Sequence, residues 1–232
     1  MTEKKDVKSH WEEIYSTKSS TEVSWYQTRP SLSLKLIRST GLEKGQGIID
    51  VGGGASLLVD CLLDEGYEGL AVLDISGRSL GIARARLGDR EEKVEWYESD
   101  ATMFKPPCQF RLWHDRAVFH FLTDEQDRRN YVNVLKEALL PEGYLIIATF
   151  AVDGPKRCSG LDTVQYDEGS MSHELGDEFV FMEKVDETHI TPGEKEQKFT
   201  YFLYLRAQEN ARMHIRSELT KNTDTNWGAQ TS

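Results

Sequence analysis

The feature that most constrains the fold is the alternation of short apolar runs with stretches of helical periodicity between residues 47 and 150. The apolar runs of strand length are residues 47–51, 70–74, 94–97, 110–114 and 144–150. The stretches with helical spacing are residues 55–65, 80–87 and 124–140. Strands and helices that alternate in this way predict a parallel sheet with helices on both of its faces.

The chain after residue 150 follows a different pattern. Two β-rich runs, 179–189 and 198–205, are joined by Thr191-Pro192-Gly193-Glu194, which is typical of a hairpin. We therefore predict an α/β fold with a doubly wound, mostly parallel seven-stranded sheet, helices on both faces and a C-terminal antiparallel hairpin. The expected divisions are a helical, aromatic segment over 1–30, the main domain over 31–206 and a polar tail over 207–232.

Composition narrows the classes of protein to consider. The chain has 232 residues, a net charge of −11 and 38% hydrophobic residues, which is enough for a core and unfavourable for binding nucleic acid over a broad surface. Its cysteines, Cys61, Cys108 and Cys158, form no CxxC pair, so no metal site is expected. The start of the chain lacks the apolar run of a signal peptide, and the longest apolar stretch has eight residues, which predicts a cytoplasmic protein without a membrane partner.

The strongest local signal is a strand that ends in a glycine-rich turn. Asp50-Val51-Gly52-Gly53-Gly54 precedes a helix, and consecutive glycines let a backbone approach a ligand without a Cβ clash. A dinucleotide fingerprint would place a further glycine at position 57, where this chain has Leu57. A carboxylate at Asp50 favours a positively charged ligand over a pyrophosphate.

Two more carboxylates follow the next two predicted strands. Asp74 ends the second strand, where a carboxylate can accept hydrogen bonds from both hydroxyls of a ribose. Asp100 follows the third strand and could accept from the amino group of an adenine. Because parallel strands end at one edge of the sheet, Asp50, Asp74 and Asp100 are expected to line one crevice.

These residues resemble the class I S-adenosylmethionine-dependent methyltransferases. Residues 50–54 are similar to the glycine-rich motif of that family, and residues 140–144 are similar to its L-x-P-G-G turn, with Glu142 in place of the first glycine. The resemblance covers about residues 25–205. It implies S-adenosyl-L-methionine as cofactor and S-adenosyl-L-homocysteine as product. It also implies a cofactor site made by Trp25, Tyr26, Asp50, Gly52, Gly54, Asp74, Ile75, Asp100, Ala101 and Asp115.

The aromatic N-terminal segment is the second informative region. In similar methyltransferases this segment folds over the cofactor, and aromatic rings can shield a cation and face it through their π electrons. Trp25 and Tyr26 lie in a polar stretch and are expected to line the site. Trp11 and Tyr15 have helical spacing, which core packing explains equally well.

The residues after the fourth strand lie on the acceptor side by position. His120 is our candidate catalytic residue, as a general base or a cofactor contact, although it could also be a buried polar residue with satisfied hydrogen bonds. Asp115-Arg116 could equally form a local ion pair.

The expected activity is methyl transfer by in-line displacement to an N, O or S nucleophile, with a small-molecule acceptor favoured. The alternative is a protein-lysine methyltransferase, since an acidic surface attracts a basic protein substrate. Two further alternatives are an NAD(P)-dependent Rossmann oxidoreductase and a non-catalytic scaffold that binds the cofactor.

Overall fold

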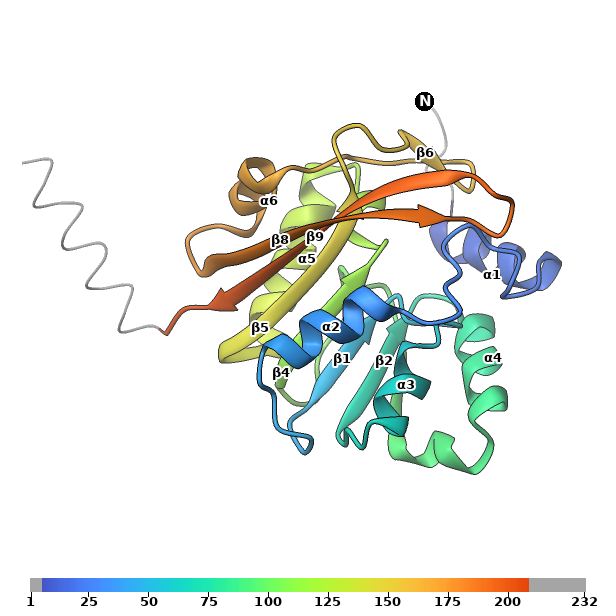
Figure 1. The fold of residues 1–232 in the computed structure, drawn as a ribbon, viewed down its shortest axis with the longest axis horizontal. Helices are drawn as coiled ribbons and strands as arrows, with labels where there is room; N and C mark the ends of the chain where they lie inside the picture. The colour runs from blue at the N-terminus through green and yellow to red at the C-terminus, as the bar shows by residue number, and fades with distance from the viewer. Residues whose placement is uncertain (1–5, 209–232) are drawn as a thin grey trace, which may run out of the picture.

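The computed structural model describes residues 6–208, which are built on a seven-stranded sheet with the strand order β3-β2-β1-β4-β5-β9-β8 (Figure 1). The strands are β1 (Ile48–Val51), β2 (Leu70–Asp74), β3 (Val94–Glu98), β4 (Phe110–Arg116), β5 (Leu139–Phe150), β8 (Phe179–Ile190) and β9 (Glu196–Arg206). β1 to β5 are parallel, whereas β9 is antiparallel to both β5 and β8. The predicted fold class and C-terminal hairpin are confirmed.

Helices cover both faces of this sheet. One face carries α2 (Ser31–Ser39), α3 (Leu58–Asp64) and α4 (Gly77–Leu87), and the other carries α5 (Glu125–Ala138) and α6 (Glu168–Leu175). Successive side chains of a strand point to opposite faces. Leu112 and His114 of β4 therefore face α2, while Trp113 and Asp115 face α5. This alternation determines which residues of β4 reach the candidate site.

The boundary between α5 and β5 differs from the prediction. Asp124 caps α5 by accepting from the backbone N–H of Gln126, as expected, but the helix ends at Ala138. The predicted strand at 144–150 begins at Leu139, because Leu139 already pairs with Phe110 of β4. The register of the pairing between β4 and β5 shifts between Phe110 and Leu112, so the turn predicted at 140–144 lies within β5. Glu142 takes a positive φ of 60° there, in place of the glycine that the resemblance led us to expect.

Several short elements were not predicted. They are α2, α6, the 3-10 turns η1 (Gly88–Lys93) and η2 (Phe119–Phe121), and the small hairpin β6 (Arg157–Cys158) with β7 (Leu161–Asp162). The hairpin lies in the segment after β5.

The N-terminal part of the chain reaches the sheet in two steps. Helix α1 (Val7–Thr17), capped by Asp6, packs against α4, where Glu12 and Arg78 form an ion pair of 3.1 Å. Residues 18–30, which we call the lid segment, then run to α2 at the carboxyl ends of β1 and β4 (Figure 1). The predicted tail lies outside the described residues from position 209 on.

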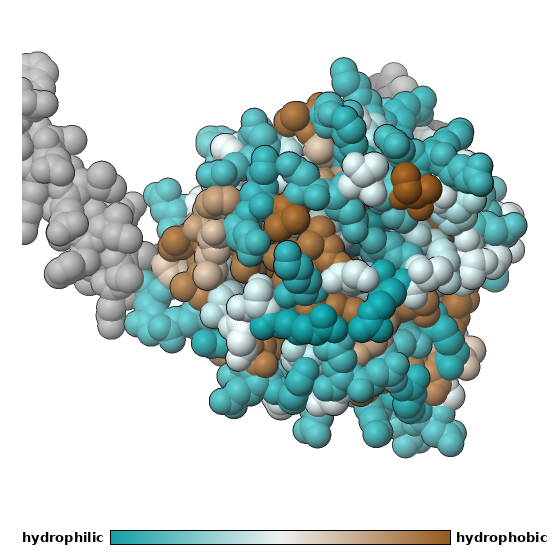
Figure 2. Space-filling model, in the orientation of Figure 1, coloured by the Kyte–Doolittle hydropathy of each residue, from teal (hydrophilic) through white to brown (hydrophobic). Residues whose placement is uncertain are grey.

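Hydrophilic side chains cover most of the face seen in Figure 2, and apolar residues come to the surface in small patches. Edge strand β8 exposes Val180, Met182 and Ile190. Within residues 6–208, no helix has both the length and the apolar character needed to cross a membrane.

Candidate functional site

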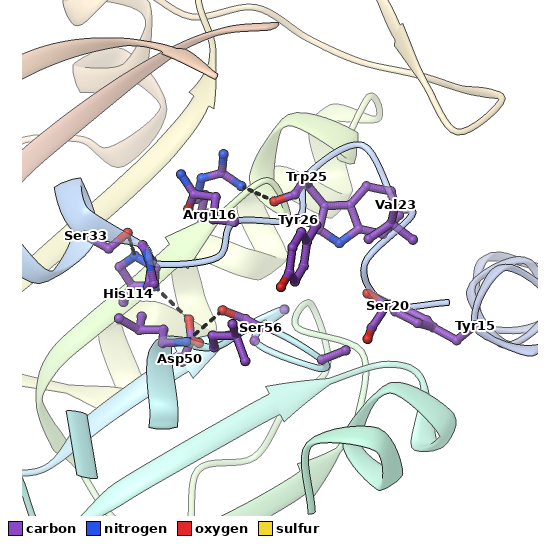
Figure 3. Close-up of a pocket in the computed structure, with 17 residues that line it drawn as sticks. Tyr15, Ser20, Val23, Trp25, Tyr26, Ser33, Asp50, Ser56, His114 and Arg116 are labelled. Carbon is purple, nitrogen blue, oxygen red and sulfur yellow. Dashed lines mark hydrogen bonds and ion pairs between the residues drawn. The ribbon is translucent and has the colours of Figure 1, made fainter. Parts of the chain in front are cut away.

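A cavity opens where the lid segment passes over the carboxyl ends of β1 and β4 (Figure 3). It encloses about 560 Å³, counting the part open to solvent. Its walls come from the lid segment, the glycine-rich turn, the start of α3, α2 and β4. The polar side chains among them are those of Tyr15, Ser20, Tyr26, Gln27, Ser33, Asp50, Ser56, His114 and Arg116.

The glycine-rich turn forms the floor of this cavity and brings two carboxylates close to the backbone. A Cβ added to Gly53 would lie 2.5 Å from Oδ2 of Asp50, and a Cβ added to Gly54 would lie 2.5 Å from Oδ2 of Asp74. Gly54 also has a positive φ of 27°. No larger residue fits at either position without displacing a carboxylate, so the two glycines keep both acids close to the backbone of the turn.

Asp50 is held from behind by a buried chain of hydrogen bonds. Nδ1 of His114 lies 2.7 Å from Oδ1 of Asp50, and Nε2 of His114 lies 2.9 Å from Oγ of Ser33 (Figure 3). All three side chains are less than one-tenth exposed. Because an ionised carboxylate only accepts, the neutral imidazole carries its proton on Nδ1 and accepts the hydroxyl proton of Ser33. The orientation of Asp50 is thereby fixed by β4 and α2.

Asp74 lies beside this turn, at the end of β2. Its Oδ1 accepts from the backbone N–H of Ser76 at 2.8 Å, and its Oδ2 faces Gly54. Burial raises the pKa of Asp74 to about 6, although the hydrogen bonds from Ser76 and Ser79 act in the opposite direction. Such a carboxylate is stabilised by a ligand that donates hydrogen bonds to it.

The other residues predicted on this side lie further along the same edge. Asp100 follows β3, and its Oδ1 accepts from both the backbone N–H and the hydroxyl of Thr102, at 2.8 and 2.7 Å. Ile75 is half-buried after β2, and Ala101 is buried next to Asp100. Like Gly54 and Asp74, these three residues do not line the cavity, and their contact with a cofactor stays a prediction.

Trp25 and Tyr26 line the cavity, and their contact with a cofactor stays a prediction. The ring of Tyr26 points toward Ser56 and Asp50 (Figure 3). Trp25 packs edge-on against Trp11, with ring centroids 5.5 Å apart, and against Tyr15 at 6.2 Å. Helix α1 therefore supports the lid segment through aromatic contacts.

The structure does not bring Asp115 into the cavity. Its side chain is fully buried on the α5 face of the sheet, where it accepts from the backbone N–H groups of Val118 and Phe119 and from the hydroxyl of Tyr131. Burial raises the pKa of Asp115 to about 6. The alternative of an ion pair between Asp115 and Arg116 is wrong, because adjacent residues of β4 point to opposite faces. Arg116 pairs with Glu187 instead.

His120, the predicted catalytic residue, does not line the cavity either. It is fully buried, its ring stacks on that of Phe150 with centroids 4.3 Å apart, and its Nδ1 accepts from the backbone N–H of Phe150. Burial lowers the pKa of His120 to about 3, so it is a weak base. The proton of the neutral ring is on Nε2, which has no hydrogen-bond partner among the described residues.

Sequence reasoning missed the position of Arg116. Its Nε donates to the hydroxyl of Tyr201 at 2.8 Å, Nη1 donates to the carbonyl of Trp25 at 3.1 Å, and Nη2 reaches Glu187 at 3.5 Å. The guanidinium also lies over the ring of Phe199, 4.4 Å from its centroid. Its place after the fourth strand was the one available signal, and its partners come from distant segments.

Two more contacts hold the lid segment. Nε2 of His189 donates to the carbonyl of Ser24 at 2.7 Å, and Nε2 of Gln27 donates to Glu187 at 3.2 Å. Among the described residues, no group of three or more His, Cys, Asp or Glu side chains is placed to hold a metal ion.

Comparison with known proteins agrees with this geometry. Residues 49–147 match the family model described as a methyltransferase domain. A mouse (Mus musculus) eEF1A lysine and N-terminal methyltransferase is 26% identical over 120 residues, which is 51% of this chain and 17% of that protein. The match thus spans less than a fifth of that relative.

Two solved structures share the fold. The description of the first structure is the conversion of a disulfide bond into a thioacetal group during echinomycin biosynthesis. This structure has a TM-score of 0.69 at 14% identity, and the match covers 92% of this chain and 99% of that chain. The other is a Burkholderia thailandensis 1,6-didemethyltoxoflavin-N1-methyltransferase with bound 1,6-didemethyltoxoflavin and S-adenosylhomocysteine. It has a TM-score of 0.65 at 15% identity and covers 87% of each chain.

Proposed function

Because this chain carries a class I S-adenosylmethionine-dependent methyltransferase domain, we propose that it transfers a methyl group to an N, O or S nucleophile on a small molecule. The observation that carries the choice of a small acceptor is the covered cavity. The lid segment closes over the strand ends and is tied down through the carbonyls of Ser24 and Trp25. A macromolecular acceptor would have to displace this cover.

The residues of the cavity fit the cofactor. The absence of Cβ atoms at Gly53 and Gly54 lets the carboxylates of Asp50 and Asp74 pack against the turn, and Gly52, Gly53 and Asp50 line the cavity. Asp74 would accept from the ribose hydroxyls, and Asp50, fixed by His114, would face the positive charge. When bound, the cofactor supplies an electrophilic methyl group on a sulfonium.

The contribution of the chain is then to align the nucleophile and exclude water. The aromatic side chains of Trp25 and Tyr26 cover the cavity, and Asp50, Ser33 and His114 form a rigid polar wall. Holding two reactants in line in this way is the main catalytic need of such a displacement.

A protein-lysine methyltransferase is the second candidate. The match to the mouse enzyme favours it, and so does a net charge of −11, which would attract a basic substrate. An NAD(P)-dependent oxidoreductase and a non-catalytic cofactor-binding scaffold are the remaining alternatives to test.

The first experiment is calorimetric titration of the protein with S-adenosylmethionine and, separately, with NAD(H). We expect binding of S-adenosylmethionine that is lost in Asp74→Ala and retained in Asp162→Ala, an exposed carboxylate on β7. Binding of NAD(H) alone would contradict the proposal.

The second experiment separates the acceptor classes. Cell extract is incubated with the protein and a cofactor labelled in its methyl group, and the label is followed in the small-molecule and protein fractions. Label in small molecules supports our proposal, and a sharp labelled protein band supports the lysine methyltransferase. No label in either fraction, together with cofactor binding, supports the scaffold.

A further inference from the structure

Arg116 is the one Lys or Arg side chain that lines the cavity in the described part of the chain. It is also deeply placed, with only 9% of its side chain exposed. Burying a cation is costly unless charge and hydrogen bonds compensate for the lost water. The groups that compensate for the buried charge of Arg116 therefore indicate the function of this side chain.

The compensation from the protein is incomplete. The guanidinium has five N–H donors, and three of them make the hydrogen bonds to Tyr201, Trp25 and Glu187. The contact with Glu187 is long at 3.5 Å, and the same carboxylate also receives Gln27 and Tyr201 at 3.2 and 3.3 Å. Two donors of a cation at the cavity wall are left for a ligand.

Arg116 is the donor that reaches the cavity. His120 lies close by, with its ring centroid 6.2 Å from that of Phe199, but it is fully buried and does not line the cavity. The unused N–H groups of Arg116 are therefore the feature of this wall that fits an anion, because a guanidinium makes its strongest hydrogen bonds to carboxylate and phosphate.

We propose that Arg116 recognises the methyl acceptor, and that the acceptor carries an oxyanion, either a carboxylate or a phosphate. This inference rests on the proposed function, because the cavity must also hold the cofactor. The oxyanion would take the free N–H pair of Arg116, while Glu187 keeps the far side of the guanidinium oriented. Arg116 is in this view a specificity residue.

The test uses the protein saturated with S-adenosylhomocysteine and three probes of similar shape: benzoate, phenyl phosphate and the neutral benzamide. Aromatic probes suit the walls formed by Trp25 and Tyr26. Binding is measured by calorimetry. We expect at least one anionic probe to bind tenfold or more tightly than benzamide, and the better of the two identifies the oxyanion.

The variant is Arg116→Gln with Glu187→Gln, which removes both charges together and leaves no unpaired buried ion. Its matched control is Arg128→Gln with Glu174→Gln, a similarly buried pair on α5 and α6, away from the cavity. We expect the preference for the anion to disappear in the first variant and to remain in the control.

If S-adenosylhomocysteine does not bind the wild-type protein, the proposed function itself fails. If it binds and no anionic probe is preferred, or if the preference survives without Arg116, the inference is overturned. A parallel loss of S-adenosylhomocysteine affinity would also overturn it, because Arg116 would then hold the carboxylate of the cofactor and not the acceptor.

Discussion

Asp74 combines burial with a carboxyl pKa of about 6, above the ordinary value of 3.8. The ionised form is therefore less favourable in the folded protein than in the unfolded chain. The stabilisation that protonated Asp74 gives the folded protein is fully present below about pH 4, and it is lost as the pH rises through about 6.

Asp74→Asn should remove this dependence. Between pH 5 and 8, the wild type should lose about 1 kcal/mol of folding free energy relative to the variant. Urea unfolding of both proteins at the two pH values checks this. Asp115 has a similar pKa and is present in both proteins, so its effect cancels. Equal pH dependence of the two proteins would contradict the assignment to Asp74.

Gly54 is the residue at which the cofactor site tolerates least change. In Gly54→Ala, the new methyl group would lie 2.5 Å from Asp74 and 2.6 Å from Oγ of Ser79. We expect cofactor affinity to fall at least tenfold, about 1.4 kcal/mol. Calorimetry with S-adenosylhomocysteine measures this fall, and a variant that binds like the wild type would mean that the cofactor lies elsewhere.

At the scale of single elements, helix α4 offers a position for stabilisation. Gly81 is exposed in the middle of this helix, and a Cβ there would meet nothing within 4 Å. Gly81→Ala should raise the free energy of unfolding by about 1 kcal/mol, because alanine loses less backbone entropy in a helix. Gly66→Ala is the contrasting variant. Its site is equally open but has a φ of +79°, so it should destabilise the protein. Thermal unfolding separates the two signs.

The elements that the sequence predicted well are those whose pattern is local. The apolar runs of β1, β2 and β4 and the capped helix α5 each carry their own signal, and so does the hairpin turn at 191–194. Helix α6 has a short, weakly amphipathic sequence, and its position depends on packing against α5 and β8. The start of β5 at Leu139 depends on pairing with β4, which the sequence of β5 does not display.

The same distinction holds for the site. Asp50, Gly54 and Asp74 could be proposed from the sequence because each lies at or shortly after the carboxyl end of its own strand. The contact between Arg116 and Trp25 joins residues 91 positions apart, and that between His114 and Ser33 joins residues 81 apart. The sequence also does not indicate which side of β4 faces the cavity. Asp115 was therefore predicted at the site, whereas the structure places Arg116 in its wall.

At the scale of the whole molecule, the lid segment links the N-terminal helix to the C-terminal hairpin. His189 on β8 donates to Ser24, and Glu187 of the same strand accepts from Gln27. Opening the cavity therefore requires the lid segment to separate from β8.

His189→Ala should loosen this connection. Loss of one hydrogen bond of about 1 kcal/mol should speed amide hydrogen exchange in residues 18–30 roughly fivefold. Exchange in β1 and β2 should stay unchanged. Thr188→Ala, at the exposed neighbouring position, is the control. Equal exchange in both variants would show that the hydrogen bond from His189 does not hold the lid segment.

Two of the atoms that fasten the lid segment are main-chain carbonyls, those of Ser24 and Trp25. Every amino acid offers the same carbonyl, so substitutions at these two positions leave the fastening chemically intact. The side chain of residue 25 can thus vary over the cavity while its backbone stays in place. In such a fold, evolution or protein engineering can exchange one acceptor for another by changing only the side chains of the lid segment that face the cavity.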